Sequence, residues 1–149
     1  MTRIERSRLV LAADDNPDDI RLLEFAWQRS GVSAPLRCLG SGEEAITYLS
    51  GQGPYANRDE HPFPKLLLLD LKMPRRDGFE VLHFIRSSES LRCLPVVMFS
   101  ASLHQEDVRR AFALGANAFL VKPVELQKLI ELVTCVDTFW LKLNQNPLA

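Results

Sequence analysis

Long hydrophobic runs are missing from this sequence. Nowhere do about 18 consecutive apolar residues occur, the length that a membrane-spanning helix requires. The first eight residues, from Met1 to Arg8, are polar and lack the apolar core of a secretion signal. We therefore expect a soluble, cytoplasmic protein without a membrane partner.

An excess of one charge is also absent. The formal net charge is −1, and lysine and arginine form no dense stretch. Basic patches are the usual electrostatic signature of proteins that bind nucleic acid or anionic lipid. Neither partner is indicated here.

Cysteines are few and widely spaced. Cys38, Cys93 and Cys135 are an odd set without CxxC spacing, so neither a disulfide framework nor a zinc site is indicated. We interpret all three as reduced residues that serve in packing.

What is present is ordinary globular composition. The 149 residues are 46% hydrophobic and 25% charged, which favours a packed domain over disorder. We expect one domain over residues 1–149, with a core from about residue 8 to residue 143 and short polar tails.

Short apolar runs alternate with segments of helical periodicity. This alternation predicts an α/β fold in which helices cover both faces of a parallel sheet. Helical spacing is clear in residues 18–30, and Ser41 with Glu44 and Ser102 with Gln105 have the pattern of capping boxes. We count five strand and helix units, with these expected strands: Leu9–Ala13, Leu36–Leu39, Leu66–Leu69, Val96–Phe99 and Phe119–Val121.

Two segments stand apart from this pattern. Residues 51–64 contain two glycines and three prolines and predict a surface loop. Residues 125–143 predict one long helix with an apolar stripe that runs through Trp140 to Leu143. A second stripe on that helix, which includes Phe139, leaves two readings open: a homodimer contact or tighter burial beneath the loop.

Polar residues follow four of the predicted strands directly. They are Asp14 with Asp15, Asp70, Ser100 and Lys122 with Pro123. The carboxyl ends of parallel strands meet at one edge of a sheet, where ligands bind. We expect these side chains to meet in one crevice.

Three aspartates gathered in one place repel one another unless a cation compensates their charge. Carboxylate ligands favour a hard ion such as Mg²⁺. Asp70 can then act as a nucleophile that forms an aspartyl-phosphate, while Lys122 and the ion offset charge on the phosphoryl oxygens and Ser100 adds a hydrogen bond.

At these positions the sequence resembles the CheY-like receiver domains of two-component response regulators, over nearly the whole chain. The resemblance implies a flavodoxin-like (βα)5 fold, a doubly wound five-stranded parallel sheet of order 2-1-3-4-5. The motifs that carry it are Asp14-Asp15-Asn16, the stretch from Leu69 to Gly78, Ser100-Ala101 and the stretch from Phe119 to Pro123.

The resemblance also implies the residue roles. Asp70 is the expected phosphoacceptor, and a sensor histidine kinase is the expected donor of the phosphoryl group. Lys122 is the phosphate-contacting lysine. Asp14 and Asp15 match the acidic pair, and the implied ligands of Mg²⁺ or Mn²⁺ are these two, Asp70 and the backbone carbonyl of Lys72. Ser100 and Phe119 match the switch hydroxyl and switch aromatic, and Pro123 matches a proline whose preceding peptide is usually cis.

Two further expectations concern the type of receiver. The long 51–64 loop and the Phe139-Trp140-Leu141 tail resemble the small stand-alone receivers that partner phytochrome-type histidine kinases. Because the last predicted helix runs almost to the terminus, we expect output through protein contacts. The chain is then no enzyme in the usual sense, and its only catalysis is its own phosphotransfer and autodephosphorylation.

Two rival functions stay open. A phosphohydrolase of the haloacid dehalogenase type also uses an aspartyl nucleophile, but its general acid is a second Asp two residues later, where this chain has Lys72. The other rival is a receiver-shaped binding module that signals without phosphate.

Overall fold

The computed structural model describes residues 8–147, and a five-stranded parallel sheet lies at their centre. The sheet has the order β2-β1-β3-β4-β5, which confirms the predicted fold class. Each strand begins within one residue of its predicted start. The strands are β1 (Val10–Ala13), β2 (Leu36–Leu39), β3 (Leu66–Leu69), β4 (Val96–Ser100) and β5 (Ala118–Val121).

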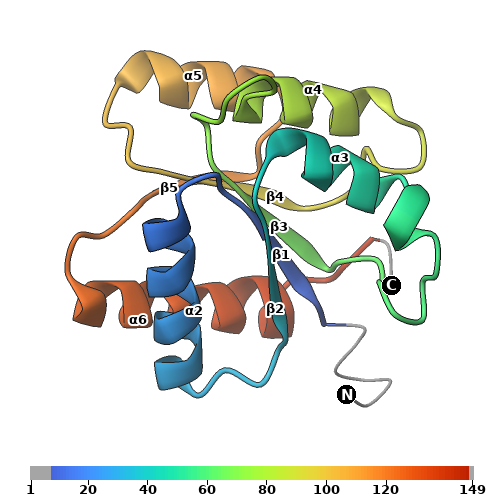
Figure 1. Ribbon diagram of the computed structural model, residues 1–149. Coiled ribbons are helices and arrows are strands. Elements are labelled where there is room, and N and C mark those ends of the chain that lie inside the picture. The colour runs from blue at the N-terminus through green and yellow to red at the C-terminus, as the bar shows by residue number, and fades with distance from the viewer. Residues whose placement is uncertain (1–7, 148–149) are drawn as a thin grey trace.

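Helices cover both faces of the sheet (Figure 1). One face carries α3 (Gly42–Leu49), α4 (Gly78–Ser87) and α5 (Gln105–Ala113), and the other carries α2 (Pro17–Ser30) and α6 (Leu126–Val136). The side chains of the central strands alternate between the two faces, as the pleat of a strand requires. Leu67 and Leu69 pack toward α4, whereas Leu66 and Leu68 pack toward α2 and α6.

Asn16 and Pro17 set the start of α2 shortly after Asp14 and Asp15 in the chain. The side chain of Asn16 accepts hydrogen bonds from the backbone N–H groups of Asp18 and Asp19, and Pro17 occupies the first turn. Proline is tolerated there because that turn has no intrahelical partner for its N–H. Gly31 ends the helix in the left-handed conformation, with φ of 75°.

The two predicted capping boxes have different outcomes. Ser41 accepts from the backbone N–H of Glu44 as expected, while the Glu44 carboxylate accepts from the N–H of Gly40. The Ser102 box is wrong, because α5 begins only at Gln105 and His104 precedes it. The Ser102 hydroxyl instead donates to the carboxylate of Asp107.

The final helix changes its winding after Val136. Residues Asp137–Leu143 form a wider π-helical segment, labelled η2. This change shifts the register, so that Leu141 is buried and Leu143 is 67% exposed. The prediction that Leu143 continues the buried stripe is therefore wrong. The buried carboxylate of Asp137 pairs with Arg8 and Lys142.

The 51–64 segment is a loop with one short 3-10 turn, η1 (Gly53–Tyr55). Polar contacts attach it to the body of the protein. The Tyr55 hydroxyl donates to Glu44 of α3, and the Arg58 guanidinium donates to the carbonyls of Leu49 and His61. Among residues 8–147, none of the helices has the length and apolar character that a membrane span requires.

Candidate phosphoryl-acceptor site

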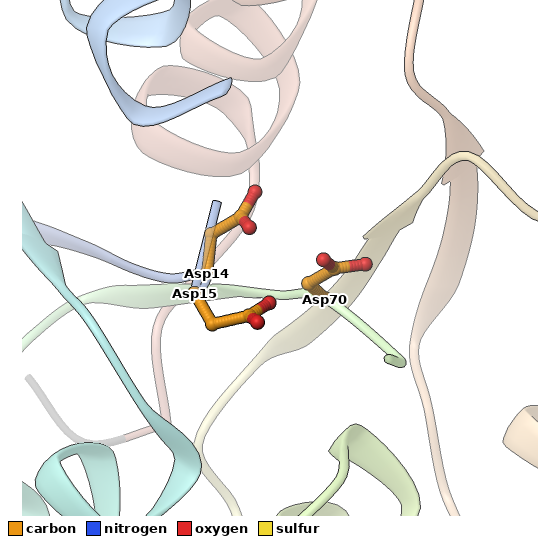
Figure 2. Close-up of side chains that lie close together, drawn as sticks. All are labelled: Asp14, Asp15 and Asp70. Atoms are coloured by element: carbon orange, nitrogen blue, oxygen red, sulfur yellow. The ribbon is translucent and has the colours of Figure 1, made fainter. Parts of the chain in front are cut away.

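The sheet register brings the acidic residues together. Ala13 and Leu69 are paired at the ends of β1 and β3, and the N–H of Asp70 donates to the carbonyl of Ala13. Asp14 and Asp70 therefore leave adjacent strands at the same level. Figure 2 shows their side chains and that of Asp15 close together.

The three carboxylates form a compact group. One oxygen of each lies within 4.8 Å of the others, and Asp14 and Asp70 are buried while Asp15 is exposed. Such a group of hard oxygen donors fits a divalent cation of the Mg²⁺ type, which binds through a few carboxylates and keeps some of its waters.

The ammonium group of Lys122 reaches the acidic cluster from the end of the edge strand β5. Lys122 directly follows β5. Its backbone N–H donates to the carbonyl of Ser100 at the end of β4, which extends the pairing of the two strands by one residue. Its Nζ lies 2.6 Å from Asp14, 2.9 Å from Asp19 and 3.2 Å from Asp70. One cation thus bridges three carboxylates.

The electrostatics follow from this geometry. Burial raises the pKa of the Asp70 carboxyl, and the neighbouring charge of Asp14 adds to the effect, while Lys122 and the N–H of Leu71 partly oppose it. Burial alone would lower the pKa of the Lys122 ammonium. The hydrogen bonds to Asp14 and Asp19 and the charge of Asp70 outweigh burial, so the pKa of Lys122 is raised.

The cluster opens into a hollow of about 510 Å³ at the carboxyl edge of the sheet. The predicted residues that line this hollow come from four strand ends, and they are Asp15, Asp70, Lys72, Ser100 and Lys122. Lys72 is exposed and also lines a second hollow, on the side of α4, together with Asp15.

The predicted switch residues lie at different depths. Ser100 is buried at the end of β4, where its hydroxyl accepts from the N–H of Ser102. Phe119 lies in β5 opposite Met98 and packs, partly buried, against the core on the side of α3, α4 and α5. It is not among the residues that line the hollow.

One expectation for Pro123 is corrected. The peptide bond between Lys122 and Pro123 is trans, since residues 8–147 contain no cis peptide. The trans form needs no special explanation, because the two isomers before proline differ by only about 0.5–1 kcal/mol.

Sequence reasoning missed Asp19. Its carboxylate joins Lys122 from the first turn of α2, the helix that begins two residues after Asp15. A helix that starts there directs its first turn at the same edge of the sheet, and this spacing was the available signal. His104 and Asn16, to which the sequence analysis gave no role in the site, line the hollow as well.

Known proteins share both the sequence pattern and the fold. Residues 10–134 match the family model of the response regulator receiver domain. Response regulator Rcp1 of Synechocystis sp. is 34% identical over 142 residues, which cover 95% of this chain and 95% of that protein.

Two solved structures resemble this one along almost its entire length. The phosphorylated cyanobacterial phytochrome response regulator RcpA has 35% identity and a TM-score of 0.85, covering 95% of this chain and 99% of that one. The Mn²⁺-bound form of Rcp1 has 33% identity and a TM-score of 0.81, covering 94% and 99% of the two chains.

Proposed function

The chain belongs to the response regulator receiver domain family, and from this premise we propose that Asp70 is its phosphoacceptor. The observation that carries the proposal is the position of the Asp70 carboxylate. Asp70 directly follows β3 and lines a hollow, and its carboxylate lies near two further carboxylates and the Lys122 ammonium.

The proposed reaction is a phosphoryl transfer from a phosphohistidine of a sensor histidine kinase. A carboxylate oxygen of Asp70 attacks the phosphorus, an oxygen–phosphorus bond forms and the nitrogen–phosphorus bond breaks. The imidazole nitrogen of the kinase keeps the bonding electron pair. Later attack by water on the aspartyl-phosphate returns Asp70 and releases inorganic phosphate, which is the autodephosphorylation we propose.

Two side chains of the site would stabilise the transferred group. Lys122 already lies 3.2 Å from Asp70, so a small movement carries its ammonium to a phosphoryl oxygen on that residue. Ser100 offers a hydroxyl from the end of the next strand. Preorganised donors of this kind stabilise charge that develops during transfer.

A divalent cation fits the acidic side of the site. Asp14, Asp15, Asp70 and the backbone carbonyl of Lys72 are the proposed ligands, and Mg²⁺ or Mn²⁺ is the proposed ion. When bound, the ion offsets negative charge on the phosphoryl oxygens. The Mn²⁺-bound form of the relative Rcp1 supports this choice.

The phosphoryl group would act as a switch by its charge, which is about −1.5 to −2 near neutral pH. Ser100 turns toward it, and the space that Ser100 leaves allows Phe119 to move inward. Pro123 fixes the backbone behind Lys122 during this change. The surface of β5 and its flanking helices would carry the signal to a partner protein.

The proposed kinase is of the phytochrome type. The support is the 35% identity to RcpA, a phytochrome response regulator, over 95% of this chain. We also propose a homodimer contact on the last helix, where Phe139 is 50% exposed beside the exposed Leu143. Neither a nucleic acid nor a membrane is a proposed partner. The proposed location is the cytoplasm. Residues 1–149 are proposed to act as one domain.

Mass spectrometry tests the central proposal. The purified chain is incubated with Mg²⁺ and the small phosphodonor phosphoramidate, beside the variants Asp70→Asn and Asp18→Asn. We expect the wild type and Asp18→Asn to gain one phosphoryl group and Asp70→Asn to gain none. Equal labelling of Asp70→Asn would contradict the assignment.

The same assay separates the rival functions. A wild-type chain that gains no phosphoryl mass would be a binding module that signals without phosphate. Multiple turnovers of a phosphomonoester such as p-nitrophenyl phosphate would indicate a phosphohydrolase instead.

A further inference from the structure

Asp19 contacts the ammonium of the site without belonging to its group of cation ligands. Its Oδ2 lies 2.9 Å from the Nζ of Lys122. The carboxylates that gather within 4.8 Å of one another are those of Asp14, Asp15 and Asp70. Asp19 is therefore a fourth acidic residue with a different position and a different neighbour.

The ammonium of Lys122 has three hydrogen-bond donors and three carboxylate acceptors. Two of the acceptors, Asp14 and Asp70, are proposed cation ligands. A divalent ion at that group competes with the ammonium for the same oxygens. The third acceptor, Asp19, is free of that competition.

The first turn of α2 fixes the backbone of Asp19. The N-cap residue Asn16 accepts a hydrogen bond from the N–H of Asp19. Its side chain is 38% exposed at the rim of the hollow that contains Asp70. Asp19 is thus fixed on a helix, and from the rim of the hollow its carboxylate contacts the ammonium of Lys122.

We propose that Asp19 is a positioning residue for Lys122, which it holds beside the site while a divalent cation occupies Asp14 and Asp70. This inference rests on the proposed function of the site. In the free protein Asp19 shares the ammonium with the two buried carboxylates. In the loaded protein it keeps the ammonium within reach of the phosphoryl group.

The variant Asp19→Asn isolates this role because the amide has the shape of the carboxylate and lacks its charge. Without Asp19, the ammonium rests wholly on Asp14 and Asp70 and competes more strongly with the cation. The matched control is Asp18→Asn, which removes the same charge one residue earlier. Asp18 pairs with Arg21 at the surface, and its side chain is 83% exposed.

Two measurements on the full chain test the proposal without relying on activity. Titration with Mg²⁺ alone, followed by NMR, gives the dissociation constant and the shift of the Lys122 ε-methylene signal. We expect Asp19→Asn to bind Mg²⁺ roughly fivefold more weakly than Asp18→Asn, the upper range for one partly exposed ion pair. We also expect the Lys122 signal to differ from wild type in Asp19→Asn and not in Asp18→Asn.

A third measurement addresses the reaction. At saturating Mg²⁺, phosphoryl uptake from phosphoramidate should be slower in Asp19→Asn than in the control, because the ammonium is no longer held at the rim. Equal Mg²⁺ affinities and unchanged Lys122 signals in both variants would overturn the positioning role while leaving Asp70 as the acceptor. A wild-type chain that binds no Mg²⁺ and takes up no phosphoryl group would overturn the proposed function, and this inference with it.

Discussion

The Lys122 ammonium and the Asp14 carboxylate lie 2.6 Å apart, although 108 positions separate the two residues in the chain. Their side chains are only 12% and 11% exposed. The ion pair joins the ends of β1 and β5, which lie on opposite sides of β3 and β4 in the sheet. We therefore expect the stability of the cation-free protein to depend on the Lys122 ammonium.

Replacing Lys122 with methionine should destabilise the protein in the absence of divalent ions. The change leaves the carboxylates of Asp14 and Asp70 buried without a counter-charge, which costs about 3 kcal/mol. Urea unfolding in the presence of a chelator measures this loss. The control Lys128→Met, at an exposed position of α6, should change the free energy of unfolding by less than about 0.5 kcal/mol. Equal stabilities of the two variants would contradict the bridging role of the ammonium.

Removing the exposed ligand should separate cation binding from stability. Asp15→Asn should leave the cation-free protein about as stable as wild type, because Asp15 is exposed. Thermal unfolding with and without Mg²⁺ is the measurement. Wild type and Asp18→Asn should gain stability with Mg²⁺, about 2.7 kcal/mol at a concentration of 100 times the dissociation constant. If Asp15→Asn gained as much, Asp15 would not be a ligand.

The stability of the cation-free protein should depend on pH through Asp70. Burial and the charge of Asp14 raise the pKa of this carboxyl in the folded state. A raised pKa contributes stability below the unfolded value, about 3.9, and that stability is lost as the pH rises through the folded value. Asp70→Asn should therefore be more stable than wild type at pH 7, with an advantage that shrinks as the pH falls toward 4. Urea unfolding across this range is the test, and a constant difference would contradict it.

Gly78 packs so closely against the backbone of Asp70 that a larger residue should destabilise the protein. A Cβ at Gly78 would lie 2.2 Å from the carbonyl oxygen of Asp70 and 2.9 Å from the Cα of Leu71. Gly78→Ala must displace this backbone. We expect the change to lower the free energy of unfolding by about 3 kcal/mol and to slow phosphoryl uptake. At Gly40 a Cβ would meet only Glu44 Oε2, at 3.8 Å, so Gly40→Ala is the matched control. Urea unfolding measures the stability of both variants, and mass spectrometry measures their phosphoryl uptake. A Gly78→Ala variant with the stability and uptake of wild type would show that the backbone at Asp70 and Leu71 moves easily.

Most of the sheet could be predicted from the sequence because its signals are local. Four leucines from Leu66 to Leu69 followed by Asp70 indicate a buried strand with a polar end, and the strand was found at those residues. The same reasoning predicted that Asp14, Asp15 and Asp70 meet, and their carboxylates do gather. A parallel sheet brings the carboxyl ends of its strands to one edge whatever its other details, so the strand pattern was enough for these predictions.

Other features depend on packing that no local pattern encodes. The π-helical turn after Val136 buries Leu141 in place of Leu143, because a small change of winding carries each later side chain around the helix. The Lys122–Pro123 peptide is trans, a choice between isomers of nearly equal energy.

The division between sequence and tertiary structure is clearest at Lys122. The chain's local pattern was enough to predict which charged groups lie at the edge of the sheet, since each of them closely follows a strand. The sharing of the ammonium with Asp19, which is 103 positions away in the chain, became visible only in the folded molecule. That pairing depends on how α2 packs against the sheet, and distances of a few ångströms between distant segments are set by the whole core.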